Sequence, residues 1–116
     1  MQRIVMLLAN GPGLPDGDIA DRLEIQASLT GQGQIDEVAY VEDPLPWPTQ
    51  RTTPDGRVYL GELIRVGTGW AIRRSGSEDD PVWPFEPALL RPGEYATMRP
   101  PEGGRLVYRV VSVEQD

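Results

Sequence analysis

Glycine and proline interrupt this chain so often that no long helix fits between them. The sequence contains 13 glycines and 12 prolines in 116 residues, and turn-forming stretches such as Asn10–Asp18, Pro54–Gly56 and Gly103–Gly104 recur along it. Glycine admits positive φ, whereas proline fixes φ and lacks a backbone N–H, so both residues favour turns. The pattern predicts many short strands joined by turns.

Composition and length are those of one ordinary globular domain. The chain is 39% hydrophobic and 25% charged. A chain of this length can bury about two-thirds of its unfolded surface, which is enough for a core without disulfides or metals. We therefore expect a single domain over residues 1–116.

Two segments in the first third of the chain have strand patterns. Residues 2–9 are apolar on both faces, as in a strand covered on both sides. Residues 22–30 alternate, with polar residues between the apolar Leu23, Ile25, Ala27 and Leu29. A helix with Ile19, Leu23 and Ala27 at spacing four is the alternative, but the period of two has more matches. The segment is predicted to be a strand.

The C-terminal half predicts two hairpins. The first joins Val58–Val66 to Trp70–Arg74 across a Gly-Thr-Gly turn and places Glu62 opposite Arg73 or Arg74. The second reverses at Gly103–Gly104 and ends in a strand rich in β-branched residues. The expected fold is all-β, or β-dominated with one short helix within 18–22 or 35–41. We expect a small, partly open barrel or a two-sheet sandwich.

Two segments of similar composition lie 36 residues apart, EDPLPWP (Glu42–Pro48) and EDDPVWP (Glu78–Pro84). Each combines an acidic pair, prolines and one tryptophan. At the same offset Tyr59 matches Tyr95. A duplicated supersecondary unit is one interpretation. It predicts that Trp47 and Trp83 occupy equivalent places.

These two segments supply the leading functional hypothesis, a non-catalytic binding or interaction module. An exposed indole beside carboxylates can stack on a ligand or bind a proline-rich or cationic partner. The candidate surface consists of Trp47, Trp83, Phe85, Glu42, Asp43, Asp79 and Asp80. The structural alternative is that each proline-flanked tryptophan plugs an open end of the barrel or sandwich and directs its indole N–H to a backbone carbonyl.

The residue types that are missing limit the chemistry of the chain. It has no cysteine and no histidine, and all 11 basic residues are arginine. Disulfides and thiolate chemistry are excluded, and the commonest general base and nitrogen metal ligand are absent. We expect no cofactor.

Two further hypotheses come from other functional classes. A small enzyme would have to use carboxylates, and Asp16, Asp18 and Asp21 could bind Mg²⁺ or Ca²⁺ through oxygen atoms, although turn and cap roles also explain them. A structural subunit could assemble through the edge strand of a hairpin.

The net charge of −7 indicates which partners to expect. An acidic chain repels phosphate backbones and anionic lipid surfaces, so we expect a protein or small ligand as partner, and neither nucleic acid nor membrane. The apolar run Ile4–Ala9 is shorter than the core of a secretory signal, and no stretch reaches membrane-spanning length. The absence of lysine suggests a GC-rich bacterial genome, and we expect a cytoplasmic protein.

Overall fold

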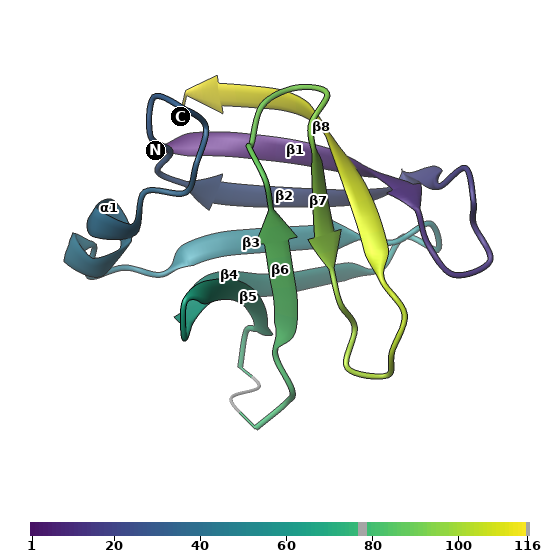
Figure 1. Ribbon diagram of the computed structural model, residues 1–116. Coiled ribbons are helices and arrows are strands. Elements are labelled where there is room, and N and C mark those ends of the chain that lie inside the picture. The colour runs from purple at the N-terminus through teal and green to yellow at the C-terminus, as the bar shows by residue number, and fades with distance from the viewer. Residues whose placement is uncertain (77–78, 116) are drawn as a thin grey trace.

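The computed structural model describes residues 1–76 and 79–115, which form eight antiparallel strands and one helix (Figure 1). Each strand pairs with the next along the chain, and the last pairs with the first, so the sheet closes into a barrel. The elements are β1 (Gln2–Asn10), β2 (Asp18–Ala27), α1 (Glu37–Glu42), β3 (Trp47–Thr52), β4 (Val58–Val66), β5 (Gly69–Arg74), β6 (Trp83–Pro87), β7 (Tyr95–Met98) and β8 (Leu106–Gln115).

The predicted β-dominated domain with one short helix is confirmed, and its barrel is closed rather than partly open. The segment with two interpretations is a strand, β2, and the helix lies in the second predicted region. Asp36 caps this helix, because its side chain accepts a hydrogen bond of 3.1 Å from the N–H of Ala39. In the described part of the chain, no helix is long and apolar enough to cross a membrane.

Both predicted hairpins are present, as β4–β5 and β7–β8. In the first, Glu62 lies opposite Arg73, whose Nε donates a hydrogen bond of 3.0 Å to the Glu62 carboxylate. The turn is one residue shorter than expected, because β5 begins at Gly69 and not at Trp70.

Side chains that alternate along the strands fill the inside of the barrel. Trp47, Tyr108 and Phe85 are the largest fully buried side chains. Burial of a large apolar side chain stabilises a fold by roughly 1.5–3 kcal/mol. The core around them contains Ile4, Met6, Leu8, Leu23, Ile25, Ala27, Leu63, Leu90, Ala96, Met98, Leu106 and Val110.

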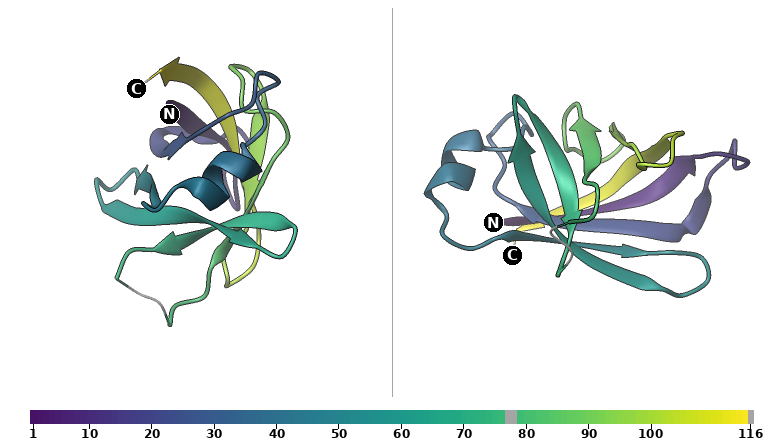
Figure 2. Two further views of the ribbon diagram at one scale, coloured as in Figure 1. Left: turned by 90° about the vertical axis from the view of Figure 1, so that its left-hand side faces the viewer. Right: turned by 90° about the horizontal axis from the view of Figure 1, so that it is seen from below.

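Helix α1 lies across one end of the barrel, called here the closed end (Figure 2, left). Tyr40 on this helix packs edge-to-face against Trp47 and Trp70, with ring centroids 5.1 Å apart in both pairs. Trp47 is completely buried, and its Nε1–H donates a hydrogen bond of 2.8 Å to Asp43. An aromatic cluster anchored by a carboxylate therefore plugs this end.

The start of β2 contains a bulge. It lies at the other end of the barrel, called here the open end. Leu7 pairs with Arg22, but Leu8 pairs with Asp18, so three residues of β2, 19–21, have no partner on β1. Before the bulge, Gly17 has a φ of +72°, and a Cβ there would lie 2.1 Å from the carbonyl oxygen of Leu8. Glycine is therefore required at this approach.

Candidate functional site

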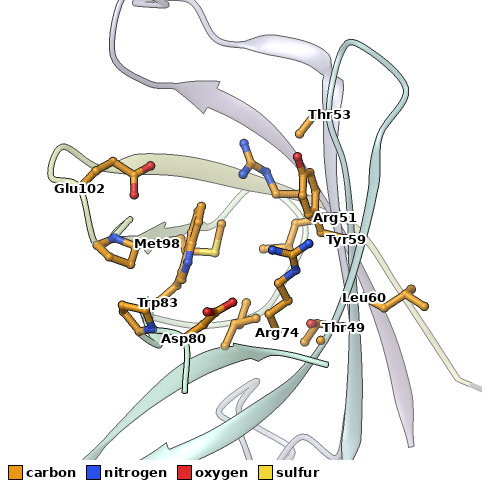
Figure 3. A pocket seen from close by; sticks show the side chains of 15 residues that line it. Thr49, Arg51, Thr53, Tyr59, Leu60, Arg74, Asp80, Trp83, Met98 and Glu102 are labelled. Atoms are coloured by element: carbon orange, nitrogen blue, oxygen red, sulfur yellow. The ribbon is translucent and has the colours of Figure 1, made fainter. Parts of the chain in front are cut away.

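A cavity of about 530 Å³ lies among the strand ends that are far from α1, and Figure 3 shows it from close by. Its lining comes mainly from β3, β4 and β5, from the start of β6 with the residues before it, and from the end of β7 with the turn after it. Binding sites for small molecules usually have volumes of roughly 300–1,000 Å³ and often lie in the mouths of β-barrels. The side chains used below are Arg51, Tyr59, Arg74, Asp80, Trp83 and Met98.

The cavity has two contrasting walls (Figure 3). Arg51, Tyr59 and Arg74 lie on one side, and the guanidinium of Arg74 is 5.6 Å from the ring centroid of Tyr59. Trp83 and Met98 lie on the other side. The guanidinium of Arg51 is 5.7 Å from the ring centroid of Trp83, within the range of a cation–π interaction. One wall therefore offers positive charge, and the other offers flat apolar surface with the carboxylates of Asp80 and Glu102 beside it.

A buried polar network holds Arg51 in place. Arg51 donates from Nη2 and Nε to the two carboxylate oxygens of Asp21, at 2.9 and 3.2 Å. The hydroxyl of Tyr108 donates to the same carboxylate at 2.8 Å. Asp21 is only 3% exposed and Tyr108 is completely buried, whereas the Arg51 side chain keeps 19% of its surface at the cavity. We call these three residues the Asp21 network.

The network keeps its two proton donors protonated. Burial raises the pKa of Tyr108 well above its ordinary value, and the negative charge of Asp21 raises it further, although Arg51 acts in the opposite direction. For Arg51, burial lowers the guanidinium pKa, but the hydrogen bond to Asp21 and the nearby Tyr108 and Asp21 outweigh this, so its pKa is raised.

The raised pKa of Tyr108 predicts a loss of stability in alkali. The unfolded chain releases this proton near the ordinary value of 10.0, whereas the folded chain retains it, so stability is complete below pH 10 and falls as pH rises above it. We expect a loss of about 1 kcal/mol between pH 9 and 11 from this residue. Urea unfolding of the wild type and of Tyr108→Phe at both pH values measures it. Equal losses in the two proteins would contradict the prediction.

The two Pro-Trp segments lie at opposite ends of the barrel. At the offset of 36 residues, the first residue of β3 matches the first residue of β6, and β4 and β5 likewise overlap β7 and β8. Neighbouring strands of this barrel are antiparallel, so strands three places apart run in opposite directions. Strand β3 therefore begins with Trp47 at the closed end, and strand β6 begins with Trp83 at the open end. The two segments do not form one surface.

The structure separates the seven residues of the predicted surface. Trp83 is half-buried and Asp80 is exposed, and both line the cavity, whereas Asp79 is exposed beside them and does not line it. Glu78, the other acidic residue of this segment, lies outside the described residues. Phe85 is buried in the core.

The acidic residues of the first segment lie at the closed end. Asp43 accepts hydrogen bonds from the N–H of Leu45 at 3.0 Å and from the indole of Trp47 at 2.8 Å. These two bonds hold the pKa of Asp43 below its ordinary value. Glu42 is exposed at the end of α1. Since Trp47 and Phe85 have almost no exposed surface, neither side chain can contact a ligand in this structure. The interpretation of Trp47 as a plug fits, with a carboxylate in place of a carbonyl as acceptor.

The three aspartates proposed as metal ligands have different surroundings. Asp21 is buried and bound by Arg51 and Tyr108. Asp18 accepts a hydrogen bond of 2.9 Å from the N–H of Ala20, and Asp16 is exposed in the preceding turn. Within the described ranges, no group of three or more acidic side chains is arranged to hold a metal ion. The turn interpretation fits Asp18.

Arg51 and Tyr108 were not predicted as site residues from the sequence, and Asp21 was predicted in another role. The signal that could have identified them is the alternation of inward and outward side chains along a strand, which has a period of two residues. Arg51 follows Trp47 and Thr49 on the inward side of β3, and Asp21 precedes Leu23 on that of β2. Tyr108 stands between two buried residues on β8. A charged residue at the next inward position after buried residues of a strand also lies inside the barrel, so it must have a hydrogen-bonding or charged partner there.

No family model, curated protein or solved structure matches this chain. The cavity and its two walls are therefore the observations from which a function can be inferred.

Proposed function

We propose that this protein is a non-catalytic binding module that holds one small molecule in the open end of its barrel. The cavity of about 530 Å³, with an apolar wall at Trp83 and a cationic wall at Arg51 and Arg74, is the observation that supports this proposal. Eight-stranded barrels are just wide enough to be filled by side chains or to hold one small ligand. Here side chains fill the closed end, and the open end keeps its space.

The cavity favours binding over carboxylate catalysis. A general base needs a carboxylate that can reach the substrate and whose pKa suits proton transfer. Asp21 already accepts hydrogen bonds from Arg51 and Tyr108, and it is not on the cavity wall. Asp80 and Glu102 do line the cavity, but both are exposed to water. Binding is therefore the function that these residues serve best.

The remaining hypotheses have less support. Each of the eight strands described here has two hydrogen-bonded neighbours, so assembly through the edge of a hairpin has no free strand to use. The net charge of −7 favours a small ligand over nucleic acid as partner. We further propose that the module acts in the bacterial cytoplasm, as the composition suggests.

Indole tests the proposed site, because it is flat, apolar and uncharged. Titration of the isotope-labelled protein with indole to about 5 mM, followed by amide and indole N–H shifts in NMR spectra, should move Thr53, Gly61 and the Trp83 indole. The indole signal of Trp47, at the closed end, should stay in place. Shifts centred on Trp47, or no shift at all, would contradict the proposal.

Two alanine variants give a matched comparison for this titration. Trp83→Ala removes the flat wall and should weaken indole binding by about tenfold. Leu60 also borders the cavity, but its side chain points away from it (Figure 3). Leu60→Ala should therefore change binding by less than about twofold.

A further inference from the structure

We infer that the cavity selects a flat apolar molecule that carries one carboxylate, an inference that rests on the proposed function. Two arginines on one wall provide the charge, and the other wall provides the apolar surface (Figure 3).

Arg74 is the first element of the carboxylate site. In the described part of the chain, seven arginines form ion pairs with carboxylates: Arg3, Arg22, Arg51, Arg57, Arg65, Arg73 and Arg99. Arg74 is not among them. Of the two arginines that line the cavity, Arg51 and Arg74, it is the one without an ion pair to a carboxylate of the described residues. Its guanidinium lies over Tyr59, which limits its orientation without neutralising its charge. A planar guanidinium matches the geometry of a carboxylate.

Arg51 is the second element. A guanidinium has five N–H donors, and Asp21 takes two of those of Arg51, one from Nε and one from Nη2. Asp21 does not take the other N–H groups of this side chain, which lines the cavity, and the guanidinium also interacts with Tyr108. Because Asp21 holds Arg51 from two oxygens, the guanidinium is already fixed before a ligand arrives. A fixed donor loses less conformational entropy on binding.

The acidic residues of the cavity do not reverse this preference. Asp80 and Glu102 are exposed, so water and salt screen their charges within roughly 10 Å at 0.1 M salt. Asp21 is buried, but Arg51 stands between it and the cavity as its partner. Arg74 is exposed as well, so the same screening acts on its charge. The half-buried guanidinium of Arg51 acts more strongly than the exposed charges of the cavity. The inner wall is therefore positive at Arg51, where a ligand would lie.

The opposite wall selects the body of the ligand. Trp83 is half-buried, Met98 lies beside it, and Leu23 and Ile72 complete the apolar lining. An indole face binds a flat ring by offset stacking, and the methionine thioether adapts to the edge of such a ring. A flat ring between these walls brings a short carboxylate arm within reach of the arginines.

Three compounds that share one ring separate the contributions of shape and charge. Indole is neutral, indole-3-acetate is an anion and tryptamine is a cation. Calorimetric titration of the full chain at about 50 mM salt should give about tenfold tighter binding of indole-3-acetate than of indole. Tryptamine should bind no tighter than indole.

Two arginine variants localise the charge effect. Arg74→Gln should reduce the affinity for indole-3-acetate to about that for indole and leave indole binding unchanged. Arg109 is exposed on β8, does not line the cavity and has no carboxylate within ion-pair distance among the described residues. Arg109→Gln removes the same charge and should change neither affinity.

The outcomes distinguish the inference from the function on which it rests. If tryptamine binds tightest, the exposed acids select a cation, and the inference is overturned while the binding site stands. Equal affinity for all three compounds would mean that the site recognises the ring alone. If Arg109→Gln weakens indole-3-acetate as much as Arg74→Gln, the effect comes from net charge and the inference fails. Failure of all three compounds to bind would overturn the proposed function itself.

Discussion

Trp47→Ala should lower the free energy of unfolding by about 4 kcal/mol, whereas Trp83→Ala should lower it by only about 1–2 kcal/mol. The two tryptophans occupy matching positions in similar segments, but their burial differs. Trp47 is completely buried, contacts the ring of Tyr40 and binds Asp43, so its removal leaves a closed void and takes one of the two hydrogen bonds that Asp43 accepts. Trp83 already borders open space at the cavity, so water can fill the room that it leaves.

Urea unfolding followed by far-UV circular dichroism measures both values. For a domain of this size, each kcal/mol corresponds to a shift in Tm of about 4 °C, which makes thermal unfolding an independent check. Fluorescence gives a second one, since Trp83→Phe removes the cavity indole and should leave the emission of the buried Trp47 and of the half-buried Trp70, which both pack on Tyr40. Equal losses of stability in the two alanine variants would show that the ends of the barrel are alike and that the assignment of a closed and an open end is mistaken.

The strands were predictable because their signal is local. Alternation in residues 22–30 identified β2, and the hairpin placed Glu62 opposite Arg73 or Arg74. The shorter turn of the structure selects Arg73. Closure of the barrel was not predictable in this way, because it depends on the pairing of β1 with β8, which are separated by most of the chain. No local pattern distinguishes a closed barrel from a partly open one.

The positions of the tryptophans show the same limit. The local sequence around Trp47 and Trp83 is similar, and in both strands the tryptophan faces inward and the following proline faces outward. The end of the barrel that each one occupies depends on strand direction. Direction follows from the number of strands between them once an up-and-down order is known, and only the structure provides that order.

The candidate site was predicted in part. Trp83 and Asp80 were among the predicted residues and line the cavity, whereas Arg51 and Arg74 were not predicted as site residues. Arg51 depends on its contact with Asp21, 30 residues earlier, and that contact depends on the pairing of β2 with β3. The two strands are separated by a helix and two loops, and no local pattern sets their register, so this contact could not be predicted.

Arg51→Met should be the most destabilising change in the cavity, with a loss of about 3–5 kcal/mol. It leaves the Asp21 carboxylate, only 3% exposed, with the Tyr108 hydroxyl as its remaining side-chain partner in the network. A buried charge that loses its counterion retains its desolvation penalty without the compensating attraction. Arg3→Met is the matched control, because it removes an arginine from the exposed pair with Glu114 and should cost less than about 1 kcal/mol.

The triple variant with Arg51→Met, Asp21→Val and Tyr108→Phe should regain most of this loss. Its free energy of unfolding should lie within about 1–2 kcal/mol of the wild-type value. Apolar residues carry no desolvation penalty, so removal of the whole Asp21 network costs less than removal of one member. If the triple variant is no more stable than Arg51→Met, the network contributes net stability. If it is stable but binds indole-3-acetate more weakly than the wild type does, the barrel does not need these buried polar groups for its own stability. Their effect is then to hold a guanidinium at the cavity wall, as ligand selection requires.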